Sequence, residues 1–266
     1  MKIPIVSVSW LQENVNNPEL IILDAVLDAP PHDLQIIGAR TFDIKNKFSD
    51  TSNPLPNTLP QPEAFATEAK KLGISKHSKI VVYDTKGVYS SPRVWYLFKS
   101  MGHENVWVLD GGFPAWEKEG FETEKVAPKS FKEGDFEASF NPEKFKTKFQ
   151  ILNNITSKDA IVIDARSSDR FHAETEEPRE GLRSGHIPNA VNLPFSKVLK
   201  DGHFLSKEEL LQILPHQDKP LYFSCGSGIT ACIDLIAYEL IGNTPKAVYD
   251  GSWTEWGQDH NLPIEK

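Results

Sequence analysis

The chain has 266 residues, of which 39% are hydrophobic and 25% charged, the balance of a globular protein with room for one large domain or two small ones. Its 29 basic and 37 acidic residues give a formal net charge of −8, which disfavours nucleic acid or an anionic membrane as the main partner, because both select basic surfaces. No apolar run approaches the ~18 residues of a membrane span, and two cysteines, Cys225 and Cys232, are too few for a disulfide framework or a cysteine-rich zinc site. Because residues 1–7 lack the apolar core of a signal peptide, we expect a cytoplasmic protein.

Helical patterns alternate along the chain with short apolar runs. A first helix is expected at Pro62–Lys71. Further along, Ser206 with Glu209 three residues later forms a capping-box pattern before a helix at Lys207–Leu214, and a longer helix is expected at Ile229–Leu240. The runs that suit buried parallel strands are Ala160–Ile163, Leu221–Ser224 and Ala247–Tyr249. The alternation predicts an α/β fold, in which a parallel sheet has helices on both faces.

The two halves of the chain repeat each other. Three pairs of segments recur in one order at offsets of 140, 141 and 140 residues: Leu23–Ala25 with Ile163–Ala165, Ile80–Asp84 with Leu221–Cys225, and Asp110–Trp116 with Asp250–Trp256. The repeat predicts two homologous domains, residues 1–122 and 147–266, joined by a linker at residues 123–146. The linker is rich in charge but also contains aromatic residues, so we expect an extended segment that is held on the surface by Phe131, Phe136, Phe140 and Phe145.

The segment after the run Leu221–Ser224 carries the strongest chemical signal. The run ends at Cys225, glycines follow at positions 226 and 228, and a helix is then expected. Glycines permit a tight curl whose backbone N–H groups point inward, and the start of a helix adds partial positive charge, so this loop suits a thiolate. The position that matches Cys225 in the first half is Asp84, and we therefore expect the first domain to be inactive. The alternative for Cys225 is a buried apolar residue, which is what we expect of Cys232.

The chain resembles the two-domain sulfurtransferases of the rhodanese superfamily, and among them the 3-mercaptopyruvate sulfurtransferases. The resemblance covers nearly the whole chain, and the loop Cys225–Ala231 matches the mercaptopyruvate-type loop with one Val-to-Ile difference, at Ile229. It implies two tandem rhodanese-like domains, each a parallel sheet with helices on both faces, and no cofactor. The other segments that carry it are the opening Val6–Leu11, the domain signature Gly185–Ala190 and the closing motif Tyr249–Trp256.

The resemblance also implies a reaction. Cys225 would take sulfur from 3-mercaptopyruvate as a persulfide, release pyruvate, and pass the sulfur to an acceptor such as a thioredoxin-like dithiol or cyanide. Arg170 and Arg179 fall at the two substrate arginines of the family, and planar guanidinium groups suit the carboxylate and keto oxygens of such a donor. Without the resemblance, these arginines would be taken for a solvated charged loop. The backbone N–H groups expected to cradle the sulfur belong to Gly226, Ser227, Gly228, Ile229 and Thr230.

One part of the family pattern is missing from this sequence. In the vertebrate-type enzymes the serine of the loop, here Ser227, is thought to work with an aspartate and a histidine of the first domain. Lys45 and Asn57 align with these two positions, so a relay like that of a serine protease is not supported. Ser227 can still donate a hydrogen bond, and Asp43 and Asp50 are weaker substitutes for the missing aspartate.

Two other functions stay open on the sequence alone. A thiosulfate sulfurtransferase would carry basic residues within the loop to meet its dianionic donor, and residues 225–231 contain no charge. A non-catalytic module could hold a persulfide for a partner protein. A phosphatase of the related fold would need an arginine six residues after the cysteine, where this chain has Ala231. No histidine shows the spacing of a metal ligand, so we expect no metal, and we expect His186 in the signature turn to tie two backbone segments together.

Overall fold

The computed structural model describes residues 3–28, 33–214, 218–242 and 244–266, and the chain divides into two compact units. Unit 1 comprises Met1–Ser52, Leu59–Asn141 and Asp201–Phe204. Unit 2 comprises Asn53–Thr58, Pro142–Lys200 and Leu205–Lys266. Two short pieces of chain, residues 53–58 and 201–204, thus belong to the unit formed mainly by the other half, which the boundaries expected from the repeat do not anticipate.

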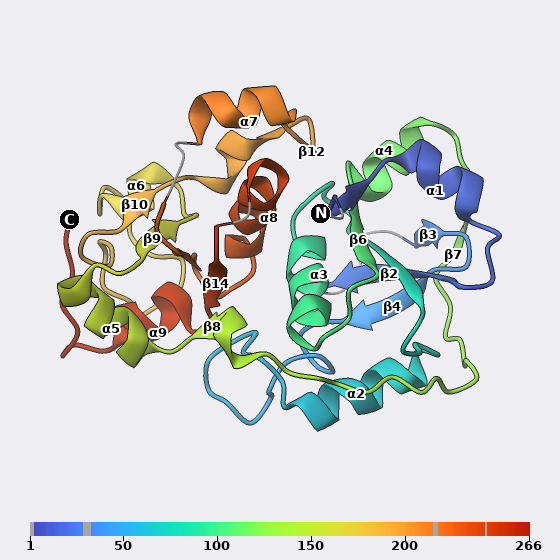
Figure 1. Ribbon diagram of the computed structural model, residues 1–266, viewed down its shortest axis with the longest axis horizontal. Coiled ribbons are helices and arrows are strands. Elements are labelled where there is room, and N and C mark those ends of the chain that lie inside the picture. Colours follow the sequence, from blue (N-terminus) through green and yellow to red (C-terminus); the bar gives the residue numbers. More distant parts are fainter. Residues whose placement is uncertain (1–2, 29–32, 215–217, 243) are drawn as a thin grey trace. The chain divides into compact units, whose positions relative to one another are not determined.

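Unit 1 is built on a five-stranded sheet whose neighbouring strands all run parallel (Figure 1). In spatial order the strands are β1 (Ile5–Val6), β6 (Val106–Leu109), β5 (Lys79–Tyr83), β2 (Leu20–Val26) and β4 (Arg40–Asp43). Unit 1 also has a separate antiparallel pair of strands, β3 (Leu34–Ile36) with β7 (Thr123–Lys125). The helices of this unit are α1 (Val8–Asn14), α2 (Pro62–Lys71), α3 (Ser91–Ser100) and α4 (Gly112–Lys118).

Unit 2 repeats this architecture with a second parallel five-stranded sheet. The strands are β10 (Val191–Asn192), β9 (Ile161–Asp164), β13 (Leu221–Ser224), β14 (Lys246–Tyr249) and β8 (Phe145–Lys146). The remaining elements of unit 2 are α5 (Lys148–Ser157), α6 (Ser168–Phe171), α7 (Lys207–Ile213), α8 (Ala231–Ile241), α9 (Ser252–Gln258), the 3₁₀ turns η1 (Pro142–Lys144) and η2 (Phe195–Val198), and strand β11 (Leu199–Lys200). Strand β12 (His203–Phe204) lies in this half of the chain but is counted with unit 1.

The two sheets have the same strand order. From one edge, unit 1 reads β1-β6-β5-β2-β4 and unit 2 reads β8-β14-β13-β9-β10, so β2 corresponds to β9 and β5 to β13, as the sequence offsets require. Each sheet is flanked by helices, and the predicted α/β class with two repeated parallel sheets is confirmed. Carboxyl ends of parallel strands are where ligands sit in such sheets, which places Cys225 at the ligand-binding edge.

Local sequence signals explain several helix boundaries. Helix α2 begins at Pro62 and ends at Lys71, as predicted, because proline suits the first helical turn. Helix α7 has the predicted capping box, in which the Ser206 hydroxyl accepts from the backbone N–H of Glu209 and the Glu209 carboxylate accepts from that of Ser206. Helix α8 begins at Ala231 rather than at the predicted Ile229, because the two preceding residues are still part of the loop.

Aromatic side chains fill the space between sheet and helices. In unit 2, Trp253 and Trp256 of α9 are fully buried in one cluster with Val162 of β9. Large aromatic residues dominate the energetics of such cores. Cys232 is fully buried on α8, which confirms its predicted place in the core. No helix among the described residues is both long and apolar enough to cross a membrane.

The stretch expected to be a linker is more structured than predicted at its two ends. Residues 123–125 form β7, which pairs with β3, and residues 145–146 form β8 at the edge of the second sheet. Between them the chain has no regular structure over residues 126–141, and two of the four predicted rings, Phe131 and Phe136, hold it to unit 1. Phe136 is 1% exposed, and Phe131 lies under the guanidinium of Arg40, 4.4 Å from the ring centroid.

Candidate active site

Cys225 lies directly after β13 and is 1% exposed. Its neighbouring backbone is fixed by the start of α9. The Cys225 N–H donates to the hydroxyl of Ser252 (3.2 Å), and the Cys225 carbonyl accepts from the N–H of Trp253 (2.9 Å). The carbonyl of the next residue, Gly226, accepts from both the N–H and the hydroxyl of Thr254, at 3.0 and 2.6 Å. Sequence reasoning singled out neither Ser252 nor Thr254, although both lie within the closing motif.

The loop after Cys225 has backbone N–H groups that the protein does not use. Among the described residues, the N–H groups of residues 226–230 donate to no protein acceptor. Gly228 has a φ of +77°, in the left-handed region that glycine tolerates without strain. Its carbonyl accepts a weak hydrogen bond from the Cys232 thiol, with Sγ 3.7 Å away, which ties the loop to α8. Free N–H groups in such a curl favour an anion.

The equivalent loop of unit 1 already holds an anion. The carboxylate of Asp84, at the position of Cys225, accepts hydrogen bonds from four backbone N–H groups at 2.8–3.0 Å and from the hydroxyl of Ser91 at 2.7 Å. The donors are Lys86, Tyr89, Ser90 and Ser91. The repeated loop geometry therefore binds one negative charge at the end of the central strand.

Both predicted arginines lie beside the loop of unit 2. A Cβ atom placed on Gly226 would lie 3.5 Å from Nη2 of Arg170 and 3.7 Å from Nη1 of Arg179. Arg179 also donates to the hydroxyls of Thr254 (3.3 Å) and Ser227 (3.4 Å). The residue next to Cys225 is thus flanked by two guanidinium groups, and the structure brings together the cysteine, the loop and the arginines that were predicted from the sequence.

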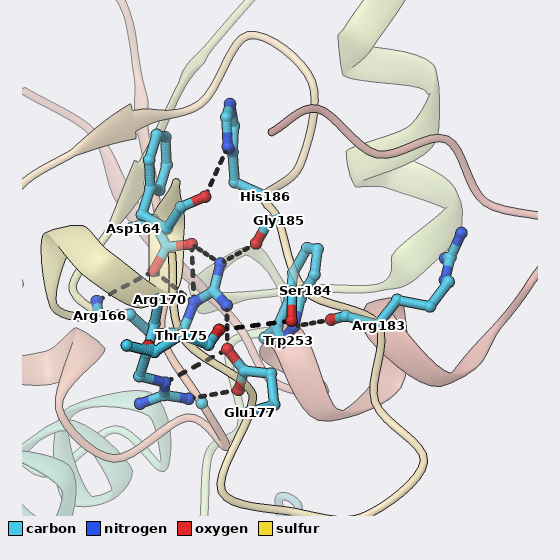
Figure 2. A network of polar contacts seen from close by, with 12 residues as sticks. Asp164, Arg166, Arg170, Thr175, Glu177, Arg183, Ser184, Gly185, His186 and Trp253 are labelled. Carbon is cyan, nitrogen blue, oxygen red and sulfur yellow. Dashed lines mark hydrogen bonds and ion pairs between the residues drawn. The ribbon is translucent and has the colours of Figure 1, made fainter. Parts of the chain in front are cut away.

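A buried chain of charges fixes Arg170 (Figure 2). The Glu177 carboxylate accepts from Arg170 Nη2 at 2.6 Å and from Arg166 Nη1 at 2.7 Å, and its side chain is 1% exposed. Arg166 in turn pairs with Asp164 at the end of β9 (2.7 Å) and lies over the ring of Trp253. Burial disfavours the charge of Arg166, but the two carboxylates more than offset this and raise its pKa. Sequence reasoning missed Glu177 because it is one of several glutamates in a charged loop.

Ser227 has an unexpected partner. Its hydroxyl oxygen accepts a hydrogen bond from the side-chain amide of Asn57 (3.1 Å), and both residues belong to unit 2. Asn57 has a φ of +59°, a conformation that asparagine adopts more readily than most residues. Lys45, at the other relay position, pairs with Asp28 at 3.6 Å in unit 1. An amide and an ammonium replace the histidine and aspartate, so these two positions supply no general base.

The remaining weaker candidates have local structural partners. Asp43 accepts from Asn46, and Asp50 accepts from Ser52. His186 bonds the carbonyl of Phe171 through Nδ1 at 2.9 Å and bonds the backbone of Glu265, so it ties segments together as predicted. Among the residues with described positions, which exclude His32 and His216, no group of three or more histidine, cysteine or acidic side chains could hold a metal ion.

Comparison with known proteins shows which family has this fold and loop. The sequence profile of the rhodanese-like domain matches twice, at residues 7–119 and 148–259. The chain belongs to the rhodanese family. It is 37% identical to the 3-mercaptopyruvate sulfurtransferase of Escherichia coli K12, over 98% of this chain and 97% of that protein. It is 35% identical to the human 3-mercaptopyruvate sulfurtransferase, over 95% and 91%.

Relatives with another named donor are about as similar. The thiosulfate sulfurtransferase of Gallus gallus is 38% identical over 95% of this chain and 92% of that protein. The crystal structure of SseA from Escherichia coli matches with a TM-score of 0.84 and 35% identity, over 95% of this chain and 99% of that chain. The chain is therefore a two-domain sulfurtransferase, which uses a small-molecule sulfur donor and a thiol acceptor. Overall identity does not choose between the two named donors, so the choice rests on the site.

Proposed function

We propose that this sulfurtransferase takes its sulfur from 3-mercaptopyruvate, and that Cys225 carries the sulfur as a persulfide. The observation that carries the proposal is the combination of an uncharged anion-binding loop with two arginines beside it. The guanidinium groups of Arg170 and Arg179 lie 3.5 and 3.7 Å from the Cβ position of Gly226. A donor with its negative charge on a carboxylate, away from the transferred sulfur, suits arginines placed around the loop rather than within it.

In the first step the Cys225 thiolate attacks the sulfur of the donor. A sulfur–sulfur bond forms and the sulfur–carbon bond of 3-mercaptopyruvate breaks, with its electron pair leaving as the enolate of pyruvate, which then takes up a proton. Arg170 and Arg179 bind the carboxylate and the keto oxygen, and they stabilise the negative charge that develops on that oxygen. The covalent intermediate divides one transfer into two easier steps.

The loop holds the sulfur that is being transferred. The N–H groups of Gly226, Ser227, Gly228, Ile229 and Thr230 have no protein acceptor and can donate to the thiolate and then to the persulfide. The Ser227 oxygen accepts from Asn57 and Arg179, so its own proton is directed away from both donors. Ser227 therefore acts as a hydrogen-bond donor to the substrate, without a proton relay.

In the second step the thiolate of an acceptor attacks the outer sulfur of the persulfide. The acceptor gains the sulfur and Cys225 leaves as a thiolate, ready for another cycle. The acceptor class that we propose is a thioredoxin-like dithiol, with cyanide as a small substitute. Neither Cys225 nor Cys232 is in a disulfide, which suits a reducing compartment such as the cytoplasm. No step requires a cofactor.

We further propose that unit 1 is catalytically inactive. Its loop is occupied by its own Asp84 carboxylate, which accepts five hydrogen bonds. A carboxylate in that position cannot attack sulfur to form a persulfide, and it repels a second anion. The domain boundaries 1–122 and 147–266, with a linker between them, belong to the same proposal.

The test is pyruvate release from 3-mercaptopyruvate by Cys225→Ser, with Cys232→Ser as the matched control. We expect no turnover from the first variant and near-normal turnover from the second, because Cys232 is buried on α8. Turnover by Cys225→Ser would falsify the mechanism. Rates with 3-mercaptopyruvate and thiosulfate, measured side by side, decide between the donors. A gain of one sulfur atom in mass without turnover on either donor would favour a persulfide-carrier module instead.

A further inference from the structure

Unit 1 has a small cavity at the edge of its sheet that corresponds to the active-site edge of unit 2. The cavity has a volume of about 150 Å³ and is lined by the end of β2 and by the loop after β5. Pockets for drug-sized ligands take roughly 300–1,000 Å³, so this cavity suits a smaller molecule. Its polar lining includes Asp24, Asp28, Asp84, Lys86 and Tyr89.

Asp24 is the unusual group in this lining. Its side chain is 3% exposed, and its Oδ1 has no hydrogen-bond partner. The equivalent residue of unit 2, Asp164, is equally buried but pairs with Arg166 through contacts of 2.7 to 3.1 Å. The position of Arg166 is occupied in unit 1 by Val26, at the same offset of 140 residues. Unit 1 therefore has the buried carboxyl without the guanidinium that neutralises it in unit 2.

The neighbouring carboxylate can also accept further hydrogen bonds. Asp84 Oδ1 accepts from one N–H, that of Lys86, whereas its Oδ2 accepts the other four hydrogen bonds. A carboxylate oxygen has two lone-pair positions, so Oδ1 has capacity left.

The electrostatics of the cavity favour a cation. Burial, and then the negative charge of Asp84, raise the pKa of Asp24 to about 7, while a hydrogen bond from Tyr83 opposes the rise. Asp28 and Lys86 are the other charged groups of the lining, and Asp28 is already paired with Lys45. A divalent metal ion fits poorly, because Mg²⁺ and Ca²⁺ take six or more oxygen ligands and no group of three or more acidic, histidine or cysteine side chains forms a site among the described residues.

We propose that this cavity of unit 1 binds a small ligand with a guanidinium group, which pairs with Asp24 as Arg166 pairs with Asp164. Asp24 and Asp84 both line the cavity, and the planar fork of a guanidinium can donate to two carboxylate oxygens at once, which a spherical cation cannot do. The site lies in the unit that we propose to be inactive, so it is separate from sulfur transfer, and its failure would leave the proposed function untouched.

The experiment is calorimetric titration of the whole chain with methylguanidinium chloride at fixed ionic strength. We expect saturable binding to the wild type at millimolar concentration, with affinity that increases as the pH rises through 7, because the cation binds the ionised form of Asp24. Asp24→Asn should bind at least tenfold more weakly, since the amide keeps the shape of the protonated carboxyl and removes its charge. Tetramethylammonium, which has the same charge but no N–H donor, should also bind at least tenfold more weakly.

A second variant tests the pairing without removing the carboxyl. Val26→Arg should supply from the chain the guanidinium that unit 2 has at Arg166, and so should both abolish methylguanidinium binding and raise the midpoint of thermal unfolding. Binding by Val26→Arg or Asp24→Asn that equals the wild type would overturn the proposal. Absence of saturable binding to the wild type, or equal binding of tetramethylammonium, would overturn it as well.

Discussion

Glu177 links Arg170 to the buried ion pairs of unit 2, and its replacement by glutamine should change both stability and activity. Its carboxylate accepts from Arg166 at 2.7 Å and from Arg170 at 2.6 Å, and both the Glu177 and Arg166 side chains are 1% exposed. The amide of Glu177→Gln has the same shape but no charge. It leaves Arg166 paired with Asp164 alone, and it leaves Arg170 without an ionic partner among these contacts.

The expected loss of stability follows from the burial of the ion pairs. Breaking a buried ion pair by removing one partner costs about 3–5 kcal/mol. The glutamine oxygen can still accept one hydrogen bond, and Arg166 keeps Asp164, so we expect the lower end, about 3 kcal/mol of unfolding free energy. For a protein of this size this corresponds to a decrease of roughly 6–12 °C in the unfolding midpoint. Arg170 also loses its orientation, so kcat/KM for 3-mercaptopyruvate should decrease by a factor of roughly 10 to 100.

The assays are chemical unfolding, thermal unfolding and pyruvate release at a temperature where the variant is folded. Glu176→Gln is the matched control, because Glu176 is exposed in the same loop and its change should stay within about 0.5 kcal/mol of the wild type. If Glu177→Gln has the same unfolding free energy as Glu176→Gln and releases pyruvate at the same rate, the buried charge network does not hold Arg170 and the reasoning is refuted.

Three further predictions concern the donor, the cavity of unit 1 and a helix cap. Arg170→Lys and Arg179→Lys keep the positive charge but lose the paired N–H groups of the guanidinium. The kcat/KM of each variant should therefore decrease much more with 3-mercaptopyruvate than with thiosulfate. Equal decreases with both sulfur donors would contradict the proposed binding of the carboxylate. The pKa of Asp24 is raised to about 7 in the folded chain, against about 3.9 in the unfolded chain. The folded state therefore binds a proton that the unfolded state releases. As the pH rises from about 4 to above 7, Asp24 should lower the unfolding free energy by about 4 kcal/mol. Denaturant unfolding across this range checks the contribution of Asp24: relative to the wild type, the decrease should be about 4 kcal/mol smaller in Asp24→Asn and unchanged in Asp28→Asn. Ser206→Ala removes the cap of α7 and should cost about 1 kcal/mol in the same assay, whereas a cost near zero would show that the capping box contributes nothing.

The parts of this structure that sequence reasoning predicted are those with local causes. The capping box of α7 needs two side chains three residues apart, and the boundaries of α2 follow from a proline and its flanking sequence. The place of Cys225 was also predictable, because a strand, a cysteine and two glycines are consecutive in the sequence. The repeat then gave the equivalence of the two sheets, since duplicated segments adopt the same strand order.

The parts that were not predicted depend on contacts between distant segments. Asn57 bonds Ser227 across 170 positions of sequence; the family alignment put Asn57 at the histidine position, but no local pattern indicated that its amide would donate to Ser227. Glu177 becomes a structural residue only because Arg166 is buried beneath it, whereas the neighbouring Glu174 and Glu176 remain exposed. Thr254 meets the loop through the packing of α9. A charged or polar residue reveals such a role only when its burial is known.

The two units together explain why one half of the repeat can transfer sulfur and the other cannot. In unit 1 the loop N–H groups surround the Asp84 carboxylate, so the repeated loop is shown binding a negative charge at the position of Cys225. In unit 2 the same position holds a thiol, and the N–H groups of residues 226–230 have no protein acceptor. A persulfide anion on Cys225 would therefore take the hydrogen bonds that Asp84 takes in unit 1. The same exchange predicts that Asp84→Cys alone would give unit 1 a thiol but no mercaptopyruvate turnover. The position of Arg166 is Val26 there, and among the residues that the structure describes Asp24 has no ion pair to match the network that orients Arg170.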